Sequence, residues 1–152
     1  MGNPEPEIKK ILVPLDFSGN SIMLIKKAGK VAQELGAELE VVHVVESLAP
    51  YMGFAVPHIP LDSMGKDLYA HAEKKMESFL EENMPAGVPH QAKVITGNDA
   101  AAEIIRHAEE NNCDLIIIAT QGFKGLPKFL FGSVAERVLK QAHCPVMTVK
   151  PR

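Results

Sequence analysis

The chain has 152 residues, of which 46% are hydrophobic, and this is enough to form one compact domain with a core. Its formal net charge of -3 disfavours nucleic-acid binding, because phosphate backbones are bound by clustered Lys and Arg. No apolar run approaches the roughly 18 residues that a membrane-spanning helix needs, so no membrane association is expected.

The sequence gives no sign of secretion, of a metal site or of a reactive thiol. The N-terminal stretch MGNPEPEIKK lacks the apolar segment of a signal peptide, and we expect a cytoplasmic protein. The histidines are scattered without a His-x-x-x-His or Cys/His cluster, so no metal held by the protein itself is expected. Cys113 and Cys144 have no redox or metal spacing and are expected to stay reduced.

The first third of the chain predicts two strands with a helix between them. An apolar run over 11–15, stopped by Asp16, predicts the first strand. Apolar residues then recur at helical spacing over 22–35, with Gly36 as a C-cap. A continuous β-branched run over 38–46 predicts a second strand covered on both faces, as in a parallel sheet.

The pattern breaks over 47–60, where prolines and a glycine interrupt many apolar residues. This composition is unusual for a solvated connection. It fits either a lid or interface segment, or a loop packed onto its own domain.

The remaining elements continue the alternation of helices and strands. A helical face over 68–80 predicts a second helix, and the partly alternating run over 90–96 predicts an edge strand. The last elements are a helix after Gly97 capped by Asn98 or Asp99, a buried strand over 114–120, a helix with its apolar face over 134–142, and a short strand over 144–150.

This order implies a single domain over residues 1–152, an α/β fold with a doubly wound five-stranded parallel sheet. In such a sheet the chain starts at the centre, so the first and fourth strands become neighbours where the winding reverses. Ligands bind outside the carboxyl ends of the strands at this switch point. The segments expected to meet there are VPLDFS after the first strand and ATQGFKG after the fourth.

Residues of these segments suit a phosphorylated ligand, although each has a structural alternative. Asp16 can accept hydrogen bonds from a ribose hydroxyl or an adenine amino group, or it can serve as a turn or N-cap residue. Gly122 permits close backbone approach, and Gly132-Ser133 opens a helix whose first amides favour a phosphate. Ser133 and Glu136 alternatively form a capping box. No Walker A sequence follows, so a P-loop NTPase is not expected.

The stretches KKILVPLDFS, VVHVVE and CDLIIIATQG…GSVAERVLKQAHCPVMTVK resemble the universal stress protein family over essentially the whole chain. The resemblance implies a flavodoxin- or Rossmann-like fold with strand order 3-2-1-4-5, usually dimeric. For one branch of the family it also implies ATP binding through Gly-x-x-Gly-(nine residues)-Gly-Ser/Thr.

The family motif fits this chain in one register. Taking Gly122 as its second glycine leaves nine residues before Gly132-Ser133 and places Ala119 at the first glycine position, a departure from the pattern. The nucleotide-binding residues that the resemblance implies are Pro14, Leu15, Asp16, Val44, Ile118, Ala119, Gly122, Gly132, Ser133 and Val134.

The resemblance therefore implies a dimeric, ATP-binding stress or signalling protein that acts as a sensor, with Mg²⁺ carried by the phosphates. No base is positioned near Ser133, so we expect a binding protein rather than an enzyme, with at most slow ATP hydrolysis. The edge strand from Pro145 to Val149 is short and apolar, and self-pairing there is the expected route to a homodimer. Ala119 keeps an alternative open: a dimeric interaction protein that binds no nucleotide.

Overall fold

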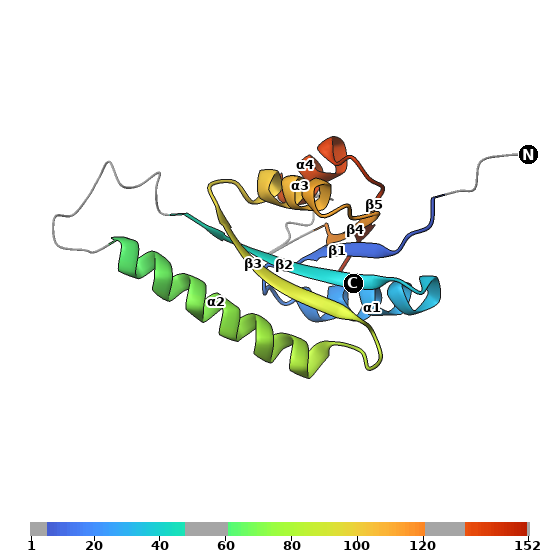
Figure 1. Cartoon of the computed structure of the whole chain (residues 1–152), viewed down its shortest axis with the longest axis horizontal. Helices are drawn as coiled ribbons and strands as arrows, with labels where there is room; N and C mark the ends of the chain where they lie inside the picture. The colour runs from blue at the N-terminus through green and yellow to red at the C-terminus, as the bar shows by residue number, and fades with distance from the viewer. Residues whose placement is uncertain (1–5, 48–60, 121–132, 152) are drawn as a thin grey trace, which may run out of the picture.

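Figure 1 shows the computed structural model of the chain, which describes residues 6–47, 61–120 and 133–151. Along these ranges, strands and helices alternate as the sequence predicts. In chain order they are β1 (Lys10–Pro14), α1 (Ser21–Leu35), β2 (Glu38–Glu46), α2 (Leu61–Asn83), β3 (His90–Gly97), α3 (Ala100–Glu110), β4 (Leu115–Ala119), α4 (Ser133–Gln141) and β5 (Val146–Val149).

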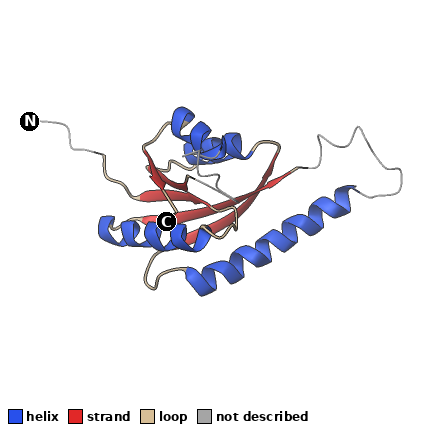
Figure 2. Cartoon of the chain, turned by 180° about the vertical axis from the view of Figure 1, so that it is seen from behind, coloured by secondary structure: helices blue, strands red, loops and turns tan. Residues whose placement is uncertain are grey.

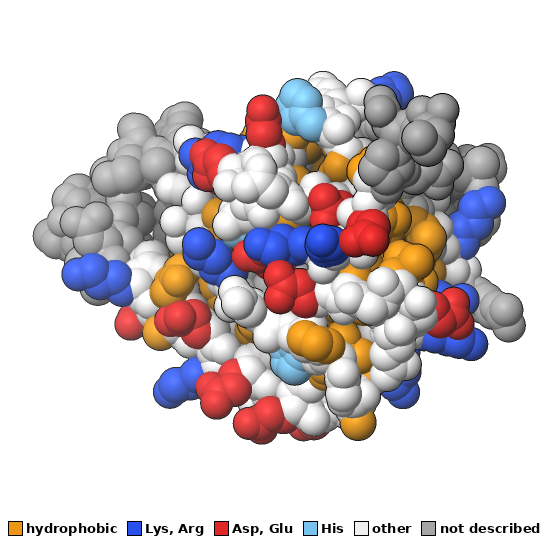
Figure 3. Space-filling model, turned by 45° about the vertical axis from the view of Figure 1, so that its right-hand side comes forward, with side chains coloured by type: hydrophobic (Ala, Val, Ile, Leu, Met, Phe, Trp, Pro, Cys, Tyr) orange, Lys and Arg blue, Asp and Glu red, His pale blue; other side chains and the backbone are white. Residues whose placement is uncertain are grey.

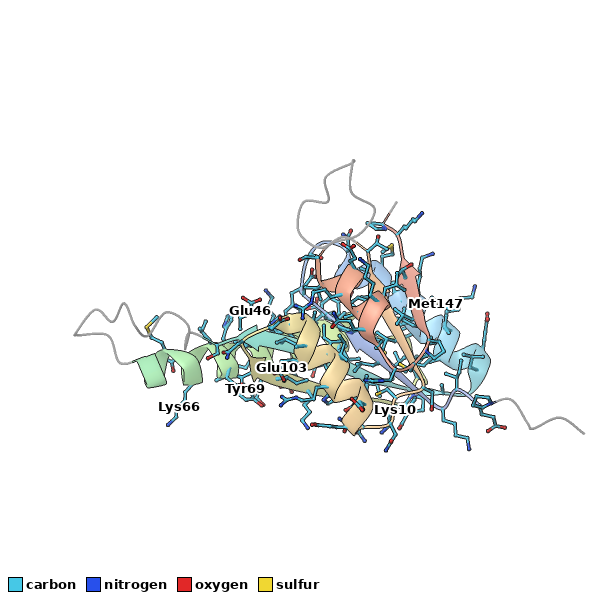
Figure 4. All side chains as sticks on the ribbon, turned by 90° about the horizontal axis from the view of Figure 1, so that it is seen from above. Lys10, Glu46, Lys66, Tyr69, Glu103 and Met147 are labelled. Carbon is cyan, nitrogen blue, oxygen red and sulfur yellow. The ribbon has the colours of Figure 1, made fainter. Side chains whose placement is uncertain are left out.

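The strands form one parallel sheet in the order β3-β2-β1-β4-β5, which confirms the predicted fold class and strand order. Strand β1 pairs with β2 on one side and with β4 on the other, so the winding reverses at β1. Strands β3 and β5 are the two edges. In Figure 4, Met147 of β5 lies well apart from Tyr69 of α2, the helix that precedes β3.

Helices α1 and α2 cover one face of the sheet, and α3 and α4 cover the other (Figures 1 and 2). Side chains of β1 alternate between the two cores: Ile11 and Val13 pack with α1 and α2, whereas Leu12 packs with α3 and α4. All three are fully buried. The continuous apolar runs of the central strands therefore reflect cover on both faces, as expected for a parallel sheet.

The ends of several elements follow the predicted local signals. Gly36 is the C-cap of α1 and has φ 66°. Glycine has no Cβ atom, so it adopts this left-handed conformation without strain. Asp99, in extended conformation, is the N-cap of α3 and accepts a 3.2 Å hydrogen bond from the backbone N–H of Ala102. The apolar loop predicted over 47–60 lies outside the described residues beyond Ser47, and its role stays a prediction.

The surface shown in Figure 3 carries Lys and Arg interspersed with Asp and Glu. Within the described ranges, no helix combines the length and the apolar character needed to cross a membrane.

Helix α1 approaches the loop between α2 and β3 so closely that only glycine fits at the contact. A Cβ atom added at Gly29 would lie 2.6 Å from Cγ of Pro85. Gly65 in α2 is different, because an added Cβ would meet no atom within 4 Å. Both glycines have helical backbone, so they differ only in how closely other atoms pack against them.

We predict that Gly29→Ala lowers the free energy of unfolding by about 1–3 kcal/mol, because the clash with the Pro85 ring outweighs the better helix propensity of alanine. The matched variant Gly65→Ala should raise it by up to about 1 kcal/mol. Urea unfolding followed by circular dichroism measures both, and stabilisation by Gly29→Ala would contradict the packing assignment.

The amino end of the sheet contains a buried polar cluster. His107 of α3 and Glu40 of β2 are buried, and His107 Nε2 lies 2.9 Å from Glu40 Oε1. Lys10 Nζ lies 3.9 Å from Glu40 Oε2. The carboxylate of Asp114 accepts hydrogen bonds from the backbone N–H groups of Lys9 and Lys10 at 2.9 and 3.0 Å. These contacts fix α3 and the start of β4 against the centre of the sheet.

We predict that His107→Ala lowers the free energy of unfolding by about 2–4 kcal/mol, because it leaves the buried Glu40 carboxylate without its closest partner. His143→Ala is the control, since His143 pairs with Glu109 at 3.3 Å on the surface. This second change should cost less than about 1 kcal/mol. Equal losses in chemical denaturation would be the contrary result.

Candidate functional site

A cavity of about 260 Å³ opens at the carboxyl ends of β1, β2 and β4. Its walls come from both sides of the sheet, because Leu24 of α1 and Ile104 of α3 both line it. The cavity therefore lies at the switch point where β1 pairs with β2 and β4.

The structure brings together the predicted site residues that it describes. Those lining the cavity are Pro14, Leu15, Asp16, Val44, Ile118, Ala119, Ser133 and Val134. Gly122 and Gly132 lie outside the described residues. Their roles in ligand binding remain predictions; what the geometry provides is that residues from four separate segments share one cavity.

Asp16 has a structural role in the turn that follows β1. Its Oδ1 accepts hydrogen bonds from the backbone N–H of Ser18 at 2.9 Å and from the Ser21 hydroxyl at 3.2 Å. The turn alternative is thus correct for one carboxylate oxygen. Asp16 is also exposed at the cavity wall, and no hydrogen bond to its Oδ2 arises from the described part of the chain.

Phe17 is held in a left-handed backbone conformation beside the cavity, with φ 59°. A phenylalanine in this region costs of order 1–3 kcal/mol, so the surrounding contacts must hold it there. Its ring centroid lies 4.5 Å from that of His43 and 5.8 Å from that of Phe79, and Lys75 Nζ lies 5.0 Å from it. Aromatic and cation–π contacts with β2 and α2 therefore oppose the backbone strain.

A hydrogen bond at Nδ1 fixes the orientation of the His43 ring. Nδ1 lies 2.7 Å from the carbonyl oxygen of Leu15, so Nδ1–H donates this bond and the neutral ring has Nε2 as an acceptor. This hydrogen bond ties β2 to the residue that follows β1, which is a structural role for Nδ1. Its ring also lines the cavity, which the sequence alone did not indicate.

Ala119, the departure from the family motif, is the last residue of β4 and pairs with Val149 of β5. It is not among the described non-glycine residues with positive φ, which are Phe17 and Asn112. Alanine therefore carries no backbone strain at this position. Its effect on a ligand is limited to the space that one methyl group takes at the cavity wall.

The first turn of α4 forms one rim of the cavity, where Ser133, Val134 and Ala135 line it. The first turn of a helix presents free N–H groups and a partial positive charge, which favour an anion. One turn further on, Arg137 Nη1 forms an ion pair with Asp99 Oδ2, the N-cap of α3. Hydrogen bonding from Arg137 and then from the Ala102 backbone lowers the pKa of Asp99. This pair ties α4 to α3 at the rim.

Two other types of site receive no support. Burial, followed by the charge of Glu40, raises the pKa of the Cys113 thiol to about 12, so no thiolate nucleophile forms there at neutral pH. Burial also raises the pKa of Cys144. In the described ranges, no group of three or more His, Cys, Asp or Glu side chains is arranged to hold a metal ion.

Several cavity residues were missed by the sequence interpretation. Ser21, Leu24, Ala100 and Ile104 line the cavity, but the sequence indicates them at most as parts of the predicted helices. Helical spacing identified the apolar face of α3, because Ile104 is buried in the core. No signal in the sequence tells which turn of that face lies at the carboxyl edge of the sheet.

The fold and the cavity define a doubly wound α/β protein with a crevice at its switch point. The family model for the universal stress protein family matches residues 7–150, and the chain belongs to this family. A curated relative, universal stress protein MJ0531 of Methanocaldococcus jannaschii, is 37% identical over 150 residues, covering 97% of this chain and 85% of the relative.

Two solved structures show the same fold. One is the structure of the hypothetical protein MJ0577, which was solved for a structure-based assignment of its biochemical function. It matches with a TM-score of 0.80 and 28% identity, covering 97% of this chain and 99% of that one. A universal stress protein from Archaeoglobus fulgidus in complex with dAMP matches with a TM-score of 0.61 and 20% identity, covering 95% and 100%. At this identity, the second likeness shows the fold alone.

Proposed function

We propose that this universal stress protein binds an adenine nucleotide, ATP, in the switch-point cavity and acts as a nucleotide-dependent sensor in the cytoplasm. The observation that supports the proposal most is the convergence of residues from β1, β2, β4 and α4 on one cavity, at positions that the family motif implies. The dAMP complex of a protein with the same fold is consistent with a nucleotide at this kind of site.

The chemistry of the walls suits the parts of a nucleotide. Leu24, Ile104 and Ile118 provide apolar surface for a base. Val44 of β2 lies beyond the last residue of β2 that pairs with β1, and its backbone groups on that side can meet polar atoms of the base. In this proposal the Asp16 carboxylate accepts a ribose hydroxyl, while its Oδ1 keeps its hydrogen bonds within the turn. The α4 N-terminus, with Ser133, provides donors for phosphate.

The volume indicates how the ligand divides between cavity and rim. About 260 Å³ is below the roughly 300 Å³ at the lower end of sites for drug-sized ligands. We therefore place the nucleoside inside and the phosphates at the rim beside α4. Any Mg²⁺ would arrive on the phosphates, since Mg²⁺ commonly keeps several waters and binds through substrate phosphates.

Universal stress proteins are in general not classical enzymes, and the proposed role is binding with at most slow hydrolysis. Rapid hydrolysis requires a group that positions or deprotonates water. His43, which lines the cavity, uses Nδ1 to bond the Leu15 carbonyl and lies against the Phe17 ring. The expectation of slow hydrolysis rests on the sequence, which positions no base near Ser133, where we place the phosphates.

We predict that Ala119→Leu weakens ATP binding at least tenfold, because the larger side chain occupies the cavity wall. Ala102→Leu, an equal change at an exposed position of α3, is the control and should bind ATP like the parent protein. Calorimetric titration after removal of co-purified nucleotide measures both.

The same titration distinguishes the alternative function. Absence of heat up to about 1 mM ATP in the parent protein, a free energy weaker than roughly -4 kcal/mol, would contradict the proposal. That outcome would favour an interaction protein without a nucleotide.

We also propose a homodimer formed through the outer edge of β5. This edge strand is four residues long, and Met147 is 41% exposed on it. An open apolar edge is a template for pairing, and a two-fold axis would give the same contact on both subunits.

We predict that Met147→Lys yields monomers in sedimentation equilibrium, because two lysines would meet at the two-fold axis. Thr96→Lys introduces the same charge at an exposed position of the opposite edge strand and should leave the oligomeric state unchanged. A parent protein that is already monomeric, or a dimer that persists in Met147→Lys, would reject pairing through β5.

A further inference from the structure

A second groove in the molecule does not belong to the switch-point cavity. It has a volume of about 740 Å³ and lies between α2 and the edge strand β3, with no lining residue in common with the cavity. Figures 1 and 2 show α2 running along β3 at this side of the sheet. We call it the α2–β3 groove.

Strand β3 presents an open edge to the α2–β3 groove. It pairs in regular parallel register with β2 over its full length, and no described strand pairs with its other side. Leu39 N–H donates to the Pro89 carbonyl, and Ser47 N–H donates to the Gly97 carbonyl. In a parallel ladder, groups facing one neighbour alternate along the strand. The odd-numbered residues therefore face β2, and the backbone groups of 90, 92, 94 and 96 face outward.

The floor of the groove is apolar and its α2 rim is acidic. Met76 and Leu80 of α2 and Val94 of β3 line it and are buried in the core behind it. Three exposed glutamates lie along α2 at intervals of four residues: Glu73, Glu77 and Glu81. The basic groups that line the groove, His90 and Lys93, lie on β3 instead, and His90 Nδ1 is occupied by the Val88 carbonyl at 2.9 Å.

The spacing of the glutamates matches that of an extended chain. Four residues of helix rise about 6 Å, whereas every second side chain of a β-strand points the same way at intervals of roughly 6.6 Å. A strand added beside β3 would thus present alternate side chains to successive glutamates over three positions. Long basic side chains suit this geometry, because their aliphatic stems can cover Met76 and Leu80 while their charges reach the carboxylates.

We propose that the α2–β3 groove binds an extended segment of another protein that carries Lys or Arg at alternate positions. The segment adds a strand to β3 through the outward backbone groups, and its cations pair with Glu73, Glu77 and Glu81. A second copy of this chain is a poorer occupant, because none of the described strands carries Lys or Arg at alternate positions. The groove is separate from the nucleotide site, so the proposal does not depend on ATP binding.

The probe is a fluorescein-labelled peptide of nine residues in which Lys and Val alternate, and the control peptide has the same composition with its lysines consecutive. Fluorescence anisotropy at low salt should show binding of the alternating peptide that is at least about fivefold tighter than that of the control. Raising the salt to about 1 M should weaken binding of the alternating peptide, because the rim charges are exposed.

Two variants separate the backbone and the charge contributions. Ala92→Pro removes one outward N–H without removing a hydrogen bond to β2, and it should weaken peptide binding about tenfold. Glu77→Gln with Glu81→Gln should weaken it about fivefold, and Glu109→Gln with Glu110→Gln, an equal charge change on α3, should not alter it. Far-ultraviolet circular dichroism and an unchanged thermal transition verify that each variant is folded.

Each contrary outcome overturns the proposal. Equal affinity for the two peptides, or equal loss in the α2 and α3 charge variants, would mean general attraction to an acidic protein. No binding up to about 1 mM peptide would exclude the groove as a site for this class of ligand. Self-association of the parent protein that Ala92→Pro abolishes would assign the edge of β3 to a second copy.

Discussion

The switch-point cavity depends on the pairing of β1 with two parallel neighbours. Since β2 and β4 lie on either side of β1, the chain must leave the sheet in opposite directions from its centre. Helices α1 and α4, which come next in the chain after β1 and β4, lie on opposite faces of the sheet, and both line the cavity. The same pairing buries Ile11, Leu12 and Val13 completely, and they directly precede Pro14 and Leu15 of the cavity wall.

Sequence periodicity was sufficient for the fold because the local signals are strong and agree with one another. Continuous apolar runs in β1, β2 and β4 indicate cover on both faces, and Gly36 and Asp99 mark helix ends by their backbone requirements. Strand β3 has a weaker apolar pattern in the sequence, and its first four residues are exposed in the structure. The resemblance to universal stress proteins then supplied the strand order and the register of the motif.

The remaining details of the site depend on contacts between distant segments, which local patterns do not encode. The sequence LDFS shows a turn, but the positive φ of Phe17 depends on rings from β2 and α2. The conformation of Ala119 was likewise undetermined until its place at the end of β4 was known. The acidic row of α2 is also visible as a spacing in the sequence, yet only the fold places it beside an open strand.

The contact between the tilted rings of Phe17 and His43 also gives the cavity an internal reporter. The chain contains no tryptophan, so tryptophan fluorescence cannot follow events at the site. An aromatic ring with its centroid 4.5 Å from the imidazole shifts the magnetic resonance of the imidazole protons through its ring current. Because the imidazole is also part of the cavity wall, the carbon-bound protons of His43 provide a label-free spectroscopic signal of what occupies the cavity.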